Sequence, residues 1–249
     1  MKKCVLLFVV LLFASSAFAV NIELDENLVF LPYDKLNLSF DETNFDTDFS
    51  DATMRNRSFF GLELSPTFFF FAPLTHLDIG VNLNLGFSVI AHEFKDLPDE
   101  PSEAYGSYVF ASVGPCFRWN FNETNSLSFI PALRYNIKDV NSNPLFIMMT
   151  ITGAEYESLY LSRYRSLAFT LAYKHWFVNT ERVHFGLNGG VDFNIPLDGT
   201  FAILYGDREP DAIYYKTDGG AAVKVFIGVC LNFGKRSLEQ AKIIEDEWY

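Results

Sequence analysis

Alternation of apolar and polar residues is the feature that most constrains how this chain can fold. In the stretch 76–92 every second position is apolar, carrying Leu77, Ile79, Val81, Leu83, Leu85, Phe87 and Val89. The positions between them carry Asp78, Gly80, Asn82, Asn84, Gly86 and Ser88. Because successive side chains of a strand point to opposite faces, this stretch predicts a strand with one apolar and one polar face.

The same alternation recurs and predicts eight strands. We expect them at residues 28–40, 59–72, 76–92, 105–121, 125–138, 165–178, 183–197 and 220–234. Tight turns at 73–75, 122–124 and 179–182 alternate with longer connections at 41–58, 93–104, 139–164 and 198–219. Short turns on one side and long loops on the other are typical of β-barrels in bacterial outer membranes, and an even strand number leaves both termini in the periplasm.

Two stretches leave alternatives open. The connection 139–164 is β-rich on both sides of residues 152–155, so it either extends strands five and six as a protruding hairpin or adds two membrane strands, making ten. The first strand contains Pro32, which has no amide hydrogen for a ladder bond. Pro32 is therefore expected at a strand start or at an unpaired position.

The apolar face is expected to point outward because of its volume. The apolar face carries six or seven large residues in most predicted strands, whereas an eight-stranded barrel encloses little more than its own inward side chains. The polar parity is rich in Gly, Ala, Ser and Asn, which fit a narrow lumen. Aromatic residues near strand ends predict a lower belt of Trp119, Phe121, Tyr173, Phe177 and Phe233 and an upper belt of Phe60, Phe87, Tyr135 and Phe193. The predicted fold class is all-β, a transmembrane up-and-down antiparallel barrel.

The amino-terminal residues predict an export signal. Lys2 and Lys3 precede an apolar run over 5–13, and small residues at positions 17 and 19 form a cleavage site. The run is too short to cross a membrane as a helix. We therefore expect a signal peptide at 1–19, a barrel at 20–235 and a short periplasmic tail at 236–249.

Charge and composition exclude several classes. The formal net charge is −12, or −14 once Lys2 and Lys3 leave with the signal, which argues against nucleic-acid binding. No later stretch reaches eighteen consecutive apolar residues, although 49% of the chain is hydrophobic and it has 27 Phe. Cys116 and Cys230 fall on strands four and eight, too far apart for a disulfide, and are expected to be buried thiols.

Charged residues on the polar face are the candidate functional set. Counting antiparallel register from the loops places Asp192 opposite Lys224 and Asp78 within one residue of Arg118. Since buried charges require partners, we expect structural ion pairs in the lumen. The remaining inward charges would select ions if the lumen were a pore, and they are Glu63, Arg134, Lys138 and Lys174. Bulky inward residues such as Tyr108, Phe110 and Trp176 favour a plugged interior.

The outer connections predict an acidic surface and little catalysis. They carry eighteen acidic and six basic residues, which we interpret as a solvated surface rather than a cation site, since no calcium-loop spacing occurs. His92 lies at the outer rim beside Glu93, but no nucleophile accompanies it. There is no phosphate loop, zinc spacing or serine-hydrolase motif, so no cofactor is expected.

The chain resembles the small outer-membrane β-barrel family that includes OmpX, OmpW and the membrane domain of OmpA, over about residues 28–234. In strand eight, Gly228, Leu231 and Phe233 match the core of the terminal signal read by the barrel assembly machinery. Two departures are Phe226, where that signal usually has a polar residue, and the residues that follow Phe233, where the family often ends.

The predicted function is a non-enzymatic outer-membrane barrel of a Gram-negative cell, with a largely plugged lumen and a structural or surface-interaction role. The alternative, implied by the OmpW resemblance, is a narrow channel for small or apolar solutes. A third hypothesis is an enzyme acting at the outer rim. Expected partners are outer-membrane lipid including lipopolysaccharide, the barrel assembly machinery and an unidentified surface partner.

Overall fold

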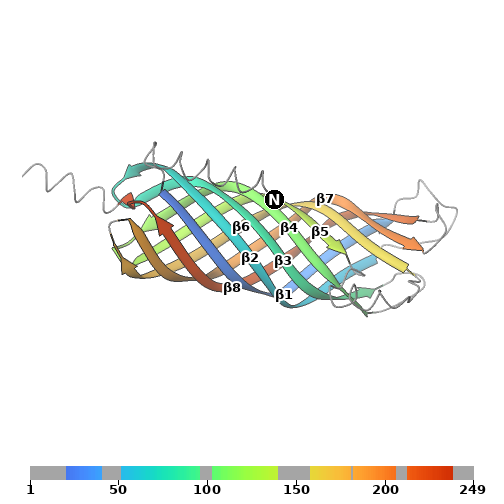
Figure 1. Cartoon of the computed structure of the whole chain (residues 1–249). Helices are drawn as coiled ribbons and strands as arrows, with labels where there is room; N and C mark the ends of the chain where they lie inside the picture. Colours follow the sequence, from blue (N-terminus) through green and yellow to red (C-terminus); the bar gives the residue numbers. More distant parts are fainter. Residues whose placement is uncertain are drawn as a thin grey trace, which may run out of the picture.

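The chain forms a closed antiparallel β-barrel whose wall is a ring of eight strands (Figure 1). The computed structural model describes residues 21–40, 52–95, 103–139, 158–180, 182–205 and 212–237. In chain order the strands are β1 (Asn21–Phe40), β2 (Ala52–Leu74), β3 (Leu77–Lys95), β4 (Glu103–Asn120), β5 (Asn125–Asp139), β6 (Ser158–Asn179), β7 (Val183–Tyr205) and β8 (Ala212–Phe233). Each pairs with its sequence neighbour, and β1 pairs with β8 to close the ring. The predicted barrel of eight strands, rather than ten, is confirmed.

The two ends of the barrel differ in how the strands are joined. At the end that we call the turn end, short connections join β2 to β3, β4 to β5 and β6 to β7. The side-chain oxygen of Asn122 accepts a bond from the Thr124 amide at 2.9 Å, which tightens one of these turns. The opposite end is the loop end, where residues 41–51, 96–102, 140–157 and 206–211 of the predicted acidic connections lie outside the described residues.

The first strand begins at Asn21, earlier than the predicted start at residue 28. Asn21, Glu23 and Asp25 are buried on the inner side, and the alternation with their neighbours already starts there. Pro32 lies where the β1–β8 register shifts between Phe30 and Tyr33. At such an irregularity the ladder does not require the amide donor that proline lacks, as expected for an unpaired position.

Several strands also run further toward the loop end than predicted, because their outward positions there are polar and the alternation fades. β2 and β7 have 23 residues each, and β5 has 15. A membrane crossing needs only about 9–11 tilted residues. The wall therefore extends beyond the apolar part of its outer surface. Of the connection 139–164, in which we expected a protruding hairpin, residues 158–164 belong to β6. Residues 140–157 of this connection lie outside the described residues.

The outer surface is an apolar band. Large exposed hydrophobic side chains come from all eight strands. They include every residue of the two predicted aromatic belts, which are Trp119, Phe121, Tyr173, Phe177 and Phe233 toward the turn end and Phe60, Phe87, Tyr135 and Phe193 further up. An apolar surface of this extent is stable against hydrocarbon rather than water. No helix in the described part of the chain is long and apolar enough to span a membrane.

Candidate functional site: the charged lumen

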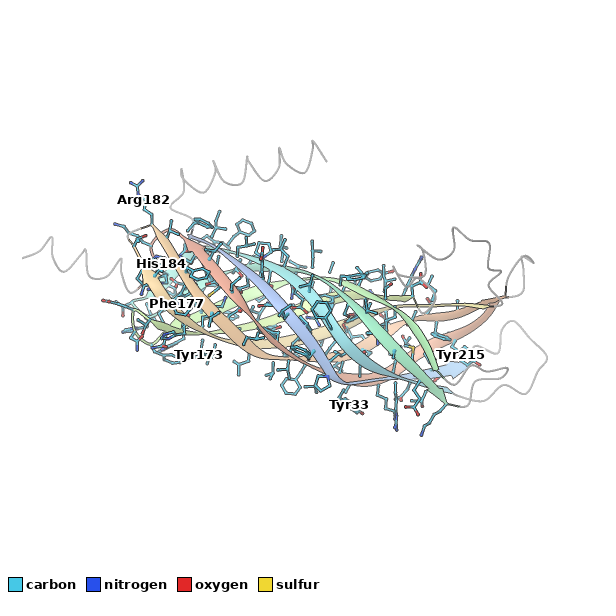
Figure 2. All side chains as sticks on the ribbon, turned by 60° about the horizontal axis from the view of Figure 1, so that its bottom comes forward. Tyr33, Tyr173, Phe177, Arg182, His184 and Tyr215 are labelled. Atoms are coloured by element: carbon cyan, nitrogen blue, oxygen red, sulfur yellow. The ribbon has the colours of Figure 1, made fainter. Side chains whose placement is uncertain are left out.

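The inner face of the barrel collects the polar parity of every strand. In Figure 2, His184 lies near the turn end and Tyr215 near the loop end. All eight charged residues predicted to face inward are buried, with relative exposures of 0–6%. Cys116 and Cys230 are also buried and are free thiols, as predicted.

Arg118 is the centre of the group nearest the turn end. Its Nε and Nη2 donate to Oδ2 of Asp78 at 3.0 and 2.8 Å, in a pair that is directly opposite in the β3–β4 register. Its Nη1 donates to Glu23 at 2.6 Å and to Asn232 at 2.8 Å. The guanidinium carbon lies 4.0 Å from the ring centroid of Phe69. One side chain thus joins β1, β3, β4 and β8.

Lys174 extends this group on the β6 side. Its ammonium donates to Glu23 and, at 2.6 Å, to Oδ2 of Asp25. The sequence had suggested Lys174 as a selectivity residue, but its two acidic partners were missed because the first strand was expected to begin later. We call Glu23, Asp25, Asp78, Arg118 and Lys174 the turn-side cluster.

A second group lies further along the lumen. Asp192 and Lys224 are opposite each other in the β7–β8 register, and their charged atoms are 2.7 Å apart. Lys224 also donates to Glu63, and Arg134 Nη2 donates to Asp192 at 2.5 Å. The ring of Phe110 lies within 4.6 Å of both cations. We call Glu63, Arg134, Asp192 and Lys224 the mid-lumen cluster.

Above it, Lys138 donates to Asp34 at 2.5 Å. Asp34 was not predicted as an inward charge, because the irregularity at Pro32 changes which residues of β1 face inward. Tyr108 donates to Asn136 at 2.6 Å on the same level. Beyond this pair, the buried inward residues toward the loop end are mostly apolar and include Leu36, Leu38, Met54, Ile90, Phe201 and Tyr215.

The residues after β8 close the turn end. Gly234 has φ 109°, a conformation that favours glycine, and there the chain turns back over the lumen. The Ser237 amide donates to Asp78 at 3.1 Å, and Arg236 donates to the carbonyl of Glu123 at 2.6 Å. Arg236 and Ser237, which we had expected in a tail at 236–249, are 0% and 3% exposed. The other residues of that predicted tail lie outside the described residues.

Charge is balanced among the buried side chains of the described residues. Six are acidic, namely Glu23, Asp25, Asp34, Glu63, Asp78 and Asp192. Six are basic, namely Arg118, Arg134, Lys138, Lys174, Lys224 and Arg236. Five of the bases form ion pairs with these acids. Pairing is required physically, because an uncompensated buried charge costs several kcal/mol.

The packed lumen leaves little free volume. A cavity of about 10 Å³ lies between the two clusters, bounded by Asp25, Glu63 and Phe226 among others. A second, also about 10 Å³, lies beside Lys224 and Tyr108. Each has room for about one water.

The three residues of the predicted assembly signal lie on β8. Leu231 and Phe233 belong to the outward parity, and Phe233 is exposed. Gly228 lies against β1, where a Cβ atom would come within 2.0 Å of the Glu26 carbonyl oxygen. Phe226, the departure from the usual signal, is buried and fills the lumen with Val29 and Ala172. The seam between β1 and β8 therefore requires a residue without a side chain at 228.

Groups suited to catalysis or metal binding are not assembled in the part of the chain that the structure describes. No set of three His, Cys, Asp or Glu side chains there could hold a metal ion. His184 lies buried with its ring nitrogens near Asn179 Oδ1 and the Gly234 carbonyl, at 3.2 and 3.1 Å. The side chain of His92, the rim residue of the enzyme hypothesis, lies outside the described set.

Comparison with known proteins identifies the fold. No family model and no curated protein matches the chain. Among solved structures, OprG from Pseudomonas aeruginosa is similar with 13% identity and a TM-score of 0.55, covering 86% of this chain and 96% of that one. A major outer membrane protein from Thermus thermophilus has 12% identity, coverages of 86% and 99% and a TM-score of 0.49. The outer membrane protease OmpT from Escherichia coli has 9% identity, coverages of 86% and 97% and a TM-score of 0.43.

The match to OprG concerns nearly the whole of both chains, so the fold is that of the small outer-membrane β-barrels. The resemblance expected from the sequence is confirmed at this level. At 13% identity the similarity concerns architecture and not activity.

Proposed function

We propose that this protein is a non-enzymatic outer-membrane β-barrel whose lumen is held closed by ion pairs and whose long loops form an acidic outer surface. Its role is structural or one of surface interaction. The apolar band on the outer face supports the membrane placement, since it matches the lipid-facing surface of such barrels.

The proposal of a closed lumen is supported by two observations together: the inward charges form ion pairs, and the interior cavities are small. Charged rings that select ions need a continuous water-filled path beside them. Here the inward cations of the two clusters are bonded to carboxylates, and two interior cavities among the described residues have a volume of about 10 Å³ each. Glu63, Arg134, Lys138 and Lys174 accordingly act as structural partners rather than as selectivity residues.

The orientation follows from the lengths of the connections. The turn end faces the periplasm, together with both termini, and the loop end faces the outside of the cell. Residues 1–19 direct export and are removed. Gly228, Leu231 and Phe233 on the last strand serve as the signal for the barrel assembly machinery, and outer-membrane lipid including lipopolysaccharide surrounds the band.

Single-channel recording in planar bilayers tests the proposal. The refolded mature chain is expected to leave the bilayer current unchanged, whereas an open porin inserted under the same conditions serves as the positive control. A steady, ion-selective open state would overturn the closed lumen and favour the narrow-channel alternative. For the enzyme hypothesis, hydrolysis by the folded barrel that disappears in His92→Ala would overturn the non-enzymatic assignment.

A further inference from the structure

The barrel wall opens between β7 and β8 near the loop end. The ladder between them runs as far as Asn194 and Ala222 and resumes in the same register at Thr200 and Lys216. In the interval, β7 pairs with β6 through Ile195, Pro196, Asp198 and Gly199. β8 pairs there with β1 through Thr217, Gly220 and Ala221. Gly219 and Gly220 have φ values of 79° and 139°, which allow β8 to bend away from its neighbour.

A surface hollow of about 510 Å³ lies at this opening. Its lining includes Arg163, Arg165, Thr200 and Lys216, so three cationic side chains border it. One carboxylate, Asp198, also borders it and pairs with Arg165. Among the described residues that line the hollow, three side chains are therefore cationic and one is a carboxylate, in a chain whose formal charge is −12.

The cations are placed by strand register. Arg163, Thr200 and Lys216 lie opposite one another on β6, β7 and β8. Since neighbouring strands are about 4.8 Å apart, the two basic residues flank the Thr200 hydroxyl at a separation of roughly 10 Å between backbones. Long flexible side chains at this spacing can converge on one tetrahedral anion, and the guanidinium fork matches phosphate oxygens.

The hollow lies at the edge of the apolar band. On β6, the next outward-facing residue from Arg165 toward the turn end is Leu167, which is 39% exposed. On β7, the residue before Asp198 is Leu197, which is 49% exposed. Tyr135, also exposed, is the register partner of Arg165 on β5. This is the level at which an acyl-chain surface gives way to headgroups, where basic side chains bind anionic lipid.

From this arrangement we propose that the hollow is a binding site for the phosphate-bearing headgroup of a membrane lipid. Arg163 and Lys216 bind the phosphate, Thr200 donates its hydroxyl, and Arg165 is held at the rim by Asp198. The acyl chains lie on Leu167 and Leu197. The site rests on the membrane placement proposed above, in which the lipid belongs to the outer leaflet and is a phosphorylated glycolipid.

Native mass spectrometry of the detergent-refolded full mature barrel tests the site, with diphosphoryl lipid A as the probe. The wild-type barrel is expected to retain this lipid. Arg163→Ser combined with Lys216→Ser is expected to weaken binding about tenfold or more, because two charge-assisted contacts are lost. Arg163→Lys with Lys216→Arg keeps both charges and is expected to retain binding.

The matched control is Arg55→Ser with Lys95→Ser, which removes two exposed cations from β2 and β3 at the same end of the barrel. Heat-modifiability on a gel verifies that each variant is folded. Equal weakening in the control variant would overturn the site, and so would equal retention of fully dephosphorylated lipid A. Displacement by inorganic phosphate at the same concentration as the lipid would show a simple anion site and overturn the lipid assignment. Because no current is measured, these outcomes are independent of whether the lumen conducts.

Discussion

The two ion-pair clusters of the lumen are built differently. In the turn-side cluster Arg118 bonds to three side chains from β1, β3 and β8, and Asp78 also accepts a bond from the Ser237 amide. The mid-lumen cluster is a linear series, from Glu63 through Lys224 and Asp192 to Arg134. The first is therefore a branched network tied to the carboxyl-terminal residues, whereas the second depends on strand pairing and packing alone.

The two clusters show that buried charge is compensated differently near the turn end and deeper in the lumen. Near the turn end the chain folds back, so backbone groups outside the strands satisfy part of the charge. Deeper in the lumen no such groups reach the described side chains, and the acids and bases satisfy one another over the Phe110 ring. The consequences of removing one partner should differ accordingly.

The largest effect is expected for Arg118→Met. It leaves Glu23 and Asp78 without the guanidinium, and breaking a buried pair costs about 3–5 kcal/mol of the free energy of unfolding. Urea titration of the barrel in lipid vesicles, followed by tryptophan fluorescence, measures this loss. Arg55→Met on the exposed side of β2 is the control and should change the free energy little. Equal losses in the two variants would mean that Arg118 is not central to the cluster.

Asp192→Asn should have a smaller effect in the mid-lumen cluster. Lys224 keeps Glu63 as a partner, and the asparagine oxygen still accepts a bond from Arg134. We expect a loss of about 2–3 kcal/mol in the same titration. A loss exceeding that of Arg118→Met would reverse the ranking of the clusters.

Ser237→Pro tests the link between the turn-side cluster and the chain end. Proline removes the amide that donates to Asp78, and a bond to a charged acceptor contributes about 1.5–3 kcal/mol. Some of this is recovered because Asp78 retains Arg118, so we expect a loss of about 1–2 kcal/mol. Ser237→Ala keeps the amide and should lose less. If both variants behave alike, the backbone bond contributes nothing.

The smallest effect we expect is the coupling between the two clusters in the free energy of unfolding. Arg118 and Asp192 share no hydrogen-bond or ion-pair partner among the described contacts. The double variant Arg118→Met/Asp192→Asn should therefore equal the sum of the single losses within about 0.5 kcal/mol. Ser237→Pro with Asp78→Ala should instead be clearly less than additive, because each variant removes the bond between the Ser237 amide and the Asp78 carboxylate.

The sequence was most informative where one strand meets the next. Alternation and the positions of the loops placed Asp78 within one residue of Arg118 and Asp192 opposite Lys224, because neighbouring strands share a register. The register of neighbouring strands could not predict ion pairs between strands that are not neighbours. Glu63 on β2 meets Lys224 on β8 with β1 between them, which depends on barrel diameter and side-chain reach.

The missed residues have local causes. Glu23 and Asp25 follow the predicted cleavage site closely, where an outward Glu26 beside Leu24 weakens the apolar parity. Asp34 was not among the predicted inward charges, because the irregularity at Pro32 interrupts a strict period of two. Arg236 and Ser237 come after the last strand, where no periodic pattern exists to place them.

Quenching by brominated acyl chains tests the central claim, that one parity of each strand meets lipid and the other fills a closed lumen. Trp119 is 46% exposed on the outer face and Trp176 is 0% exposed inside. Two variants are compared, and both carry Trp248→Phe. The variant that also carries Trp176→Phe retains Trp119, and its fluorescence should be strongly quenched in brominated vesicles. The variant that also carries Trp119→Phe retains Trp176, and its fluorescence should not be quenched. Quenching of Trp176 with an unaffected Trp119 would contradict the assignment of the two faces.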